Sequence, residues 1–389
     1  MSENIKLIIA GDVFPTPVNY QLFAEGNIEQ LFDQKILDIF KSGDYRICNL
    51  EGCFTGDNTK PKLKDGPNIR ASKECVAAFS GLGVNCVSLA NNHATDFGLD
   101  GLKDTFNVLS KAGIAFFGAG ENEPAIVSYH TIKLKGKRIT FYGVSETIEN
   151  APAQTLPGVN IYDEYRVCQE LRLLKSKCDL LIVLYHGGIE NIHFNTPSIR
   201  KRFHRMADNG ADIIISQHTH AIGEEEFYNS SYFLYGQGNF CFHFSKKLYE
   251  WVETALLLEI DLNDNDYTIK RHLVRRDGPS VLYDDGQNLT GFYERSKRLS
   301  EGDTFKNELQ KLADEKLLVY LEAFRGNNII DKVARKLLSK EQYIEYLIRH
   351  YSQKHILKIL LALQCEEFRE VSSQGLLNML AKLEERHGE

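Results

Sequence analysis

Apolar segments with the character of strands alternate with helical segments through the first two-thirds of the chain. Lys6–Ala10 is a short β-prone run, and residues 28–41 repeat apolar side chains at helical spacing. The alternation continues to about residue 261, with a hairpin predicted where Lys135-Gly136-Lys137 separates two apolar runs. This pattern predicts an α/β core, to which the hairpins add antiparallel strands at the edges.

The character of the sequence changes after about residue 275. Residues 279–291 are rich in Gly, Asp and turn formers and predict a linker. From about residue 292 the chain is rich in Leu, Lys, Glu and Arg, with leucines at roughly helical spacing. We therefore predict a main α/β domain over 1–278 and a helical subdomain over 292–389. A structural cap is the simpler interpretation of the helical tail, and a surface for a protein partner or a second copy is the alternative.

Five of the predicted strands end in a polar phrase. These phrases are GDVF at 11–14, NLEG at 49–52, LANNHATDFG at 89–98, YHGGIE at 185–190 and SQHTH at 216–220. Strands that end in carboxylate, amide and imidazole side chains are how an α/β protein builds a metal site at the edge of a sheet. The candidate ligands are Asp12, Glu51, Asn92, His186, His218 and His220. Together they suit two divalent ions held side by side, as in many hydrolases.

The histidines are the strongest members of this set, because each follows an apolar strand. A spacing of two residues lets His218 and His220 face one site if the backbone turns between them. Neutral imidazoles combined with the carboxylates of Asp12 and Glu51 favour Mn²⁺, Fe²⁺ or Zn²⁺ over Mg²⁺ or Ca²⁺. Taken alone, Asp12 would be an ordinary turn residue and Glu51 a capping residue.

His93 follows two asparagines directly after a predicted strand, and we interpret it as a catalytic residue. A histidine beside a metal site can donate a proton to a leaving oxygen or stabilise charge on the transferring group. Asp96 can bind the other imidazole nitrogen and so set the tautomer of His93. The alternative is an Asn-rich turn with a structural histidine. Three further polar residues of these phrases, Asn49, Asn91 and Glu190, are candidates for contacting substrate, and so is Asn239 in the later phrase YGQGNF at 235–240.

Charge and hydropathy exclude several classes of protein. The net charge is −7, and dispersed Lys and Arg form no general basic footprint for nucleic acid. No apolar run approaches the roughly 18 residues that a membrane span requires. The apolar run at Leu7–Ala10 is far shorter than that of a signal peptide. Eight cysteines without a CxxC pair favour small buried thiols in a reducing compartment. We therefore expect a cytoplasmic protein.

The order GD, NLEG, LANNHxxDFG, HGGxE, HxH and GNF resembles the bacterial CapA family, also called poly-γ-glutamate capsule biosynthesis proteins. That family is similar to the calcineurin-like metallophosphoesterases. The resemblance covers about residues 5–245, and its most specific part is LANNHATDFGLDGLKDTFNVLSKAGIAFFGAGEN. It implies a metallophosphoesterase-type fold of two packed mixed sheets flanked by helices, with the site at the strand ends. It also implies that the six candidate ligands named above bind metal and that His93 is the acid.

Several positions depart from the pattern of these families. Phe14 stands where metallophosphoesterases usually have a histidine, and Glu51 stands where they usually have a bridging aspartate. CapA relatives usually carry a tryptophan at the position of Gly187 and a GHHPH-like phrase at 216–220. Many also carry an N-terminal membrane anchor, which we do not find in this sequence. The loss of a ligand at position 14 weakens one metal position, so a single ion is the alternative to two.

The function implied is that of a metal-dependent hydrolase in which metal-bound hydroxide attacks a phosphoester or a γ-glutamyl amide. The substrate would be an anionic polymer or a phosphoester. The alternative is a non-catalytic accessory or assembly factor for an anionic capsular polymer, which uses the same cleft to bind it. A metal-stabilised structural protein is a third interpretation, and strand-end ligands do not favour it, because structural metal sites are closed cages.

Overall fold

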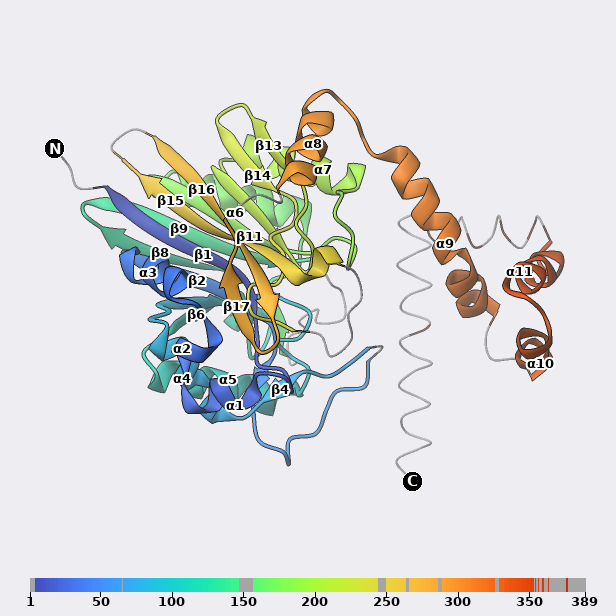
Figure 1. Cartoon of the computed structure of the whole chain (residues 1–389). Coiled ribbons are helices and arrows are strands. Elements are labelled where there is room, and N and C mark those ends of the chain that lie inside the picture. The colour runs from blue at the N-terminus through green and yellow to red at the C-terminus, as the bar shows by residue number, and fades with distance from the viewer. Residues whose placement is uncertain are drawn as a thin grey trace. The chain divides into compact units, whose positions relative to one another are not determined.

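A computed structural model of the chain describes residues 4–64, 66–146, 157–243, 250–263, 266–285, 289–325 and 329–352, with isolated positions beyond 352. The chain divides into two compact units, residues 1–305 and 306–389. The first unit holds all the described strands, and the second unit is helical in its described part (Figure 1). The predicted α/β core is therefore confirmed, and it occupies the first unit.

The first of two large sheets has seven strands in the order β17-β16-β15-β1-β2-β5-β6. Their bounds, in that order, are Ser280–Tyr283, Tyr267–Asp277, Thr254–Leu262, Ile5–Val13, Tyr45–Leu50, Cys86–Ser88 and Ala115–Phe117. Strands β1, β2, β5 and β6 run parallel to one another, and β15 pairs antiparallel with β1. The carboxyl ends of β1, β2 and β5 therefore meet at one edge of this sheet.

The second large sheet has six strands in the order β13-β14-β12-β11-β9-β8. Their bounds, in that order, are Glu225–Tyr228, Ser231–Leu234, Ile213–Gln217, Leu180–His186, Lys137–Ser145 and Tyr129–Leu134. Strands β9, β11, β12 and β14 are parallel, and β8 and β9 form the predicted hairpin. Two short pairs, β3 (Cys53–Phe54) with β4 (Arg70–Ala71) and β7 (Ala119–Gly120) with β10 (Gly158–Val159), complete the strands.

The two sheets pack face to face, and helices cover their outer faces. The helices of the first unit are α1 (Tyr20–Glu25), α2 (Ile28–Leu31), α3 (Gln34–Ser42), α4 (Val76–Gly81), α5 (Gly98–Lys111), α6 (Glu164–Lys175), α7 (Pro197–Asp208) and α8 (Thr290–Ser300). Helices α1 to α5 contribute apolar side chains to the core on the first sheet, and α6 to α8 contribute to the core on the second. The expected two-sheet α/β fold flanked by helices is confirmed.

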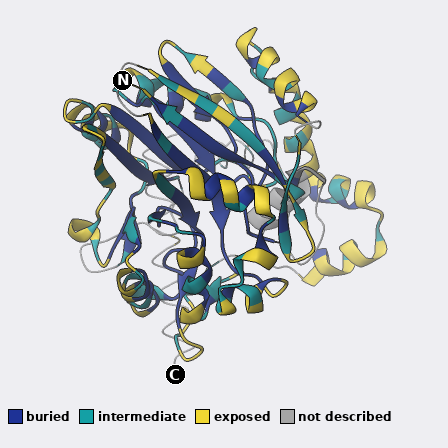
Figure 2. Cartoon of the chain, turned by 60° about the vertical axis from the view of Figure 1, so that its left-hand side comes forward, coloured by how far each residue is buried: buried dark blue, intermediate teal, exposed yellow. Residues whose placement is uncertain are grey.

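The alternation of side chains along each strand explains why both faces of the sheets are buried. On β1, Leu7 and Ile9 face the other sheet, whereas Ile8 and Ala10 face the helices. Strands β11 and β12 are buried along their whole length in the same way. Strands buried on both faces have continuous apolar sequences, as these do. Figure 2 shows the central strands in dark blue, whereas strands at the edges and the outer surfaces of the helices carry teal and yellow.

Two local predictions were wrong. Residues 28–41, predicted as one helix, form α2 and α3, because Phe32 is extended and Asp33 caps α3 by accepting from the Ile36 amide at 3.0 Å. The predicted linker 279–291 contains β17, which pairs with β16. Helix α8 clusters with the first unit, and the helical subdomain over 292–389 stays a prediction.

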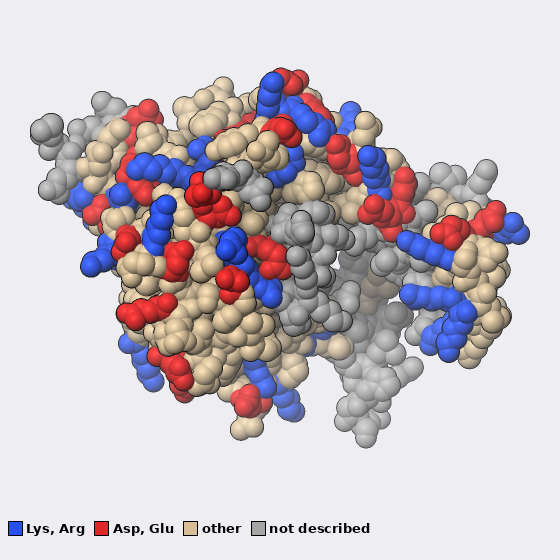
Figure 3. All heavy atoms as spheres, viewed as in Figure 1, with Lys and Arg blue, Asp and Glu red and all other residues tan. Residues whose placement is uncertain are grey.

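The second unit contains α9 (Lys306–Arg325), α10 (Ile329–Leu337) and α11 (Lys340–Arg349). Ser339 begins α11 with a capping box that includes Gln342. The leucine pattern predicted at 357–383 lies almost wholly outside the described residues. Among the helices that are described, none has the length and apolar character to span a membrane. On the described part of the face in Figure 3, Lys and Arg are mixed with Asp and Glu, as expected from the dispersed charges of the sequence.

Candidate metal centre

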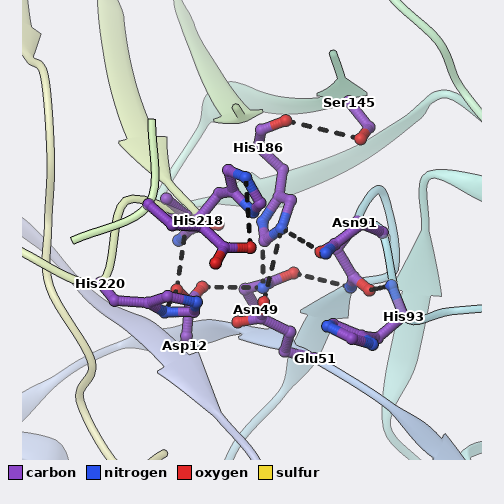
Figure 4. Close-up of polar contacts among 12 residues, drawn as sticks. Asp12, Asn49, Glu51, Asn91, His93, Ser145, His186, His218 and His220 are labelled. Carbon is purple, nitrogen blue, oxygen red and sulfur yellow. Dashed lines mark hydrogen bonds and ion pairs between the residues drawn. The ribbon is translucent and has the colours of Figure 1, made fainter. Parts of the chain in front are cut away.

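The carboxyl ends of parallel strands from both sheets converge on one buried polar site. Asp12 lies near the end of β1, Glu51 directly follows β2, and Asn92 follows β5 by four residues. His186 ends β11, and His218 directly follows β12. His220 completes the set of six, whose labelled members face one another in Figure 4. All six are buried except His218, whose side chain is 12% exposed. The structure thus brings together every residue that the sequence suggested as a metal ligand.

Glu51 is common to two groups of candidate ligands. Ligand atoms of Asp12, Glu51 and His220 all lie within 4.8 Å of one another. Those of Glu51, His186 and His218 also lie within 4.8 Å of one another. The arrangement therefore contains two adjacent positions for a cation that share one carboxylate.

The Glu51 carboxylate is fully buried, and neither of its oxygens has a hydrogen-bond partner among the described residues. Its Oε1 lies 3.6 Å from His186 Nε2. Burial, together with the charge of Asp12, raises the pKa of Glu51 well above its usual range. An unpaired buried carboxylate is costly for a fold, and a bound cation removes that cost. The residues therefore fit a divalent ion.

Asp12 is held in place by its neighbours on two strands. Asn49 lies directly across from it on β2 and donates Nδ2–H to Asp12 Oδ1 at 2.8 Å. The backbone amide of His218 donates to Asp12 Oδ2 at 3.2 Å. Burial raises the pKa of Asp12. Gly11 before it is required by close packing, because a Cβ there would lie 2.4 Å from the Gly238 carbonyl oxygen.

His218 and His220 both adopt left-handed backbone conformations, with φ of 85° and 55°. This is the backbone turn that the spacing of two residues predicted, and it is unusual for residues other than glycine. His220 Nδ1 lies 2.8 Å from Asn239 Oδ1 and 3.7 Å from Asp12 Oδ2. His218 Nδ1 has no hydrogen-bond partner in the described part of the chain.

Burial favours the neutral form of the three candidate histidine ligands, His186, His218 and His220. Burial lowers the pKa of His218 and of His220 to about 4. Burial also lowers the pKa of His186 well below its usual range, and the neighbouring histidines lower it further. A histidine must be neutral to bind a metal ion, so these groups are ready to act as ligands without losing a proton.

The turn after β5 joins the ligands to His93. Asn92 Oδ1 lies 2.8 Å from His186 Nε2, so this turn touches the second sheet. His93 Nδ1 lies 2.7 Å from Asp96 Oδ2, and Asp96 is fully buried. This is the contact that the sequence suggested for the pair. With Nδ1–H donated to Asp96, the Nε2 of His93 is left for other partners.

The four residues suggested for substrate contact lie in different surroundings. Asn49 and Asn91 are fully buried, and Asn91 Nδ2 donates to Asn49 Oδ1 at 3.0 Å. Asn91 Oδ1 also accepts from the His93 amide at 3.0 Å. Glu190 is exposed, with Oε1 4.0 Å from His218 Nε2. Asn239 is buried against His220. Of the four, Glu190 alone combines exposure with nearness to the candidate ligands, and the three buried asparagines are placed to orient their neighbours.

Phe14 stands at the position where the sequence resemblance led us to look for a histidine ligand. Its ring is fully buried and stacks on Phe54 with 5.9 Å between the ring centroids. It also lies over Gly52, where a Cβ would meet the ring at 2.5 Å. The position is therefore part of the apolar core and supplies no donor to the site.

Lys64 is the residue near the site that the sequence did not reveal. Its Nζ lies 2.6 Å from Asp96 Oδ1, and its side chain is 4% exposed. It belongs to the loop between β3 and β4, where Lys60 and Lys62 are also found. One lysine among several in a polar loop carries no pattern that singles it out.

Comparison with known proteins gives matches over most of the first unit. The sequence model of a family described as bacterial capsule synthesis protein PGA_cap matches residues 6–244. The PGA biosynthesis protein CapA of Bacillus subtilis (strain 168) is 29% identical over 230 residues, which cover 55% of this chain and 60% of that protein. The match thus spans less than two thirds of that relative's length.

Two further matches are longer. The capsule biosynthesis protein CapA of Bacillus anthracis is 25% identical over 351 residues, which cover 86% of this chain and 81% of that protein. A crystal structure described as a novel phosphatase from Mycoplasma pneumoniae is 15% identical with a TM-score of 0.46, and it covers 72% of this chain and 96% of that one.

Proposed function

Because this chain belongs to the family of bacterial capsule synthesis proteins whose model spans residues 6–244, we propose that it is a metal-dependent hydrolase of capsule or poly-γ-glutamate biosynthesis. The bond that it cleaves is a phosphoester or a γ-glutamyl amide in an anionic substrate. The observation that carries the proposal is Glu51, whose buried carboxylate belongs to both ligand groups and has no hydrogen-bond partner among the described residues.

We infer that two divalent ions bind side by side. Asp12, Glu51 and His220 hold one ion. The other ion would be held by Glu51, His186 and His218. The amide oxygen of Asn92, which lies beside His186 Nε2, would be a further metal ligand. A mixed set of carboxylates and imidazoles favours Mn²⁺, Fe²⁺ or Zn²⁺. When bound, such ions lower the pKa of water and stabilise negative charge on a transferring group.

The other residues of the site would donate a proton, orient the ligands and contact the substrate. His93 donates a proton from Nε2 to the leaving group or stabilises its charge, while Asp96 holds Nδ1. Asn49 keeps Asp12 oriented through the contact at 2.8 Å. Asn91 fixes the His93 backbone, and Asn239 orients the His220 ring. Glu190, exposed beside His218, contacts the substrate.

The proposal is tested by metal content and turnover together. Protein purified without chelator is expected to contain close to two metal equivalents per chain. With Mn²⁺ it is expected to hydrolyse an aryl phosphomonoester or phosphodiester, or to release glutamate from a γ-linked polymer. His93→Gln should abolish turnover and keep the metal content. A metal content near zero would remove the basis of the proposal, and normal turnover of His93→Gln would reject its role as the acid.

A second function is favoured by the names of the relatives, which refer to the synthesis of a polymer and not to its hydrolysis. In this function the chain is a non-catalytic accessory or assembly factor, and the metal centre binds an anionic capsular polymer. The helical second unit would then bind a protein partner or a second copy. Metal-dependent binding of poly-γ-glutamate without turnover of any substrate class would support this alternative and reject the hydrolase.

A further inference from the structure

Lys64 places a buried ammonium group beside the His93–Asp96 pair. Its side chain is 4% exposed, and Nζ lies 2.6 Å from Asp96 Oδ1. The same Nζ lies 3.3 Å from the Asn92 carbonyl oxygen and 3.3 Å from His93 Nδ1. Lysine side chains are almost never this deeply buried unless they are paired. The pairing with Asp96 satisfies that requirement.

The loop between β3 and β4, which carries Lys64, binds Asp96 at two further points. The backbone amide of Ile69 donates to Asp96 Oδ2 at 2.7 Å, and that of Lys62 donates to the Asp96 carbonyl oxygen at 2.7 Å. Asn68 Nδ2 closes the loop on the Lys62 carbonyl oxygen at 3.0 Å. The orientation of the Asp96 carboxylate is therefore set from outside its own turn, by this loop.

The Lys64 ammonium is directed at protein groups. Two of its three N–H groups have acceptors, Asp96 Oδ1 at 2.6 Å and the Asn92 carbonyl oxygen at 3.3 Å, and His93 Nδ1 also lies 3.3 Å from Nζ. The shorter of the two contacts to His93 Nδ1 is that from Asp96, at 2.7 Å against 3.3 Å for Lys64. His93 Nδ1–H therefore donates to Asp96, and the shortest contact of the ammonium is also with Asp96, at 2.6 Å.

We propose that Lys64 is a positioning residue that acts through Asp96. It holds one carboxylate oxygen, so that the other oxygen accepts from His93 Nδ1–H and Nε2, the nitrogen that donates the proton, is directed into the candidate metal centre. In Figure 4 the His93 ring extends toward Glu51, in agreement with this direction. Through the Asn92 carbonyl the same ammonium also fixes the residue that meets His186. The inference rests on the proposed role of His93 as the proton donor.

The kinetic test uses Lys64→Met, Asp96→Asn and the double variant, with Lys73→Met as the matched control. Lys73 also pairs with an aspartate, Asp104 at 2.8 Å, in the same region of the first unit. We expect Lys64→Met to lower kcat by roughly 10- to 100-fold with KM unchanged, as for other residues that orient a histidine. The double variant should be no slower than Asp96→Asn, and Lys73→Met should resemble the wild type. A raised KM with normal kcat, or additive losses in the double variant, would overturn the proposal.

A spectroscopic test separates this proposal from the proposed hydrolase function. Histidine ¹⁵N spectra of the Zn²⁺-loaded full chain report the tautomer of each ring, and His93→Gln assigns the His93 signals. We expect the proton on Nδ1 in the wild type and a mixture of tautomers in Lys64→Met. Lys64→Gln keeps a hydrogen-bond donor for Asp96, so its tautomer ratio should lie between those of the wild type and Lys64→Met. It replaces Lys64→Met in this test if that variant does not fold. A wild-type Nδ1 without a proton, or an unchanged spectrum in the variants, rejects the role of Lys64 whether or not the protein shows turnover.

Discussion

Asn92 Oδ1 lies 2.8 Å from His186 Nε2, and this contact joins the turn after β5 in the first sheet to the end of β11 in the second. Both side chains are buried, so water does not compete for the contact. The two sheets come from distant parts of the chain, and each supplies three of the six candidate ligands. The contact between Asn92 and His186 therefore joins the two halves of the candidate metal centre.

Replacing Asn92 with alanine is expected to lower the free energy of unfolding by roughly 1–3 kcal/mol, because a buried ring nitrogen of His186 loses its partner. Urea denaturation in the presence of chelator measures the change. Asn122→Ala, which removes an exposed cap, is the control and should cost about 1 kcal/mol or less. An equal fall in the free energy of unfolding in the two variants would show that the contact between the sheets contributes no more to stability than an exposed helix cap.

Glu51→Gln is expected to stabilise the metal-free protein by on the order of 1 kcal/mol at pH 8, because it removes an unpaired buried charge. It should also abolish the stabilisation that Mn²⁺ gives to the wild type, about 2.7 kcal/mol at a hundred times Kd. Thermal unfolding with chelator and with Mn²⁺ measures both effects.

Glu259→Gln is the matched control, because Glu259 is also buried but is paired by Lys6 at 2.8 Å and by Lys270 and His272. These partners lower the pKa of Glu259 to about 2. Its replacement should therefore destabilise the protein and leave the response to Mn²⁺ intact. If both variants changed stability in the same direction, Glu51 would not be an unpaired buried carboxylate that a bound cation neutralises.

Substituting glutamine for His186 or for His218 is expected to reduce the bound metal by about one equivalent, because both belong to the same ligand group. His204→Gln is the control, since His204 bonds Glu226 at 3.0 Å outside this site. Elemental analysis of protein dialysed against a fixed free Zn²⁺ concentration gives the ratio. An unchanged ratio in both ligand variants would rule out this position for an ion.

The pH dependence of stability is expected to show the ionisation of Glu224. This side chain is fully buried, accepts from Asn195 and faces Arg295 on α8. Burial raises its pKa from 4.5 to about 7. A raised folded-state pKa means that the contribution to stability is complete below pH 4.5 and is lost as the pH rises through 7. Relative to Glu224→Gln, the wild type should lose roughly 3 kcal/mol over that window. Parallel pH profiles of unfolding for the two proteins would contradict this.

Introducing a histidine at position 14 is not expected to add a metal ligand. The ring at this position packs on Phe54 and over Gly52 in the apolar core. Phe14→His should therefore lower the free energy of unfolding by roughly 2–4 kcal/mol without raising the metal content. Phe14→Leu, which keeps the position apolar, separates loss of packing from burial of a polar ring. A gain of bound metal in Phe14→His would show that the core opens to the site.

The two-sheet core and the set of candidate ligands could be predicted from the sequence because both depend on local patterns. A polar residue such as His186 at the end of an apolar strand must lie at the carboxyl edge of a parallel sheet. Lys64 could not be found this way, since its burial depends on where a long loop crosses a distant turn. The break between α2 and α3 was missed because the Asp33 cap interrupts a helical apolar pattern that otherwise continues.

The left-handed backbone at His218 and His220 means that the sequence most favourable for folding is not the sequence that makes the site. Asparagine and glycine adopt this conformation more easily than histidine, so either residue at these positions would relax the loop. A screen that selects only for thermal stability should therefore enrich replacements at both positions and remove two candidate metal ligands. The two histidines therefore lower the stability of the fold, which indicates that they serve a role other than folding.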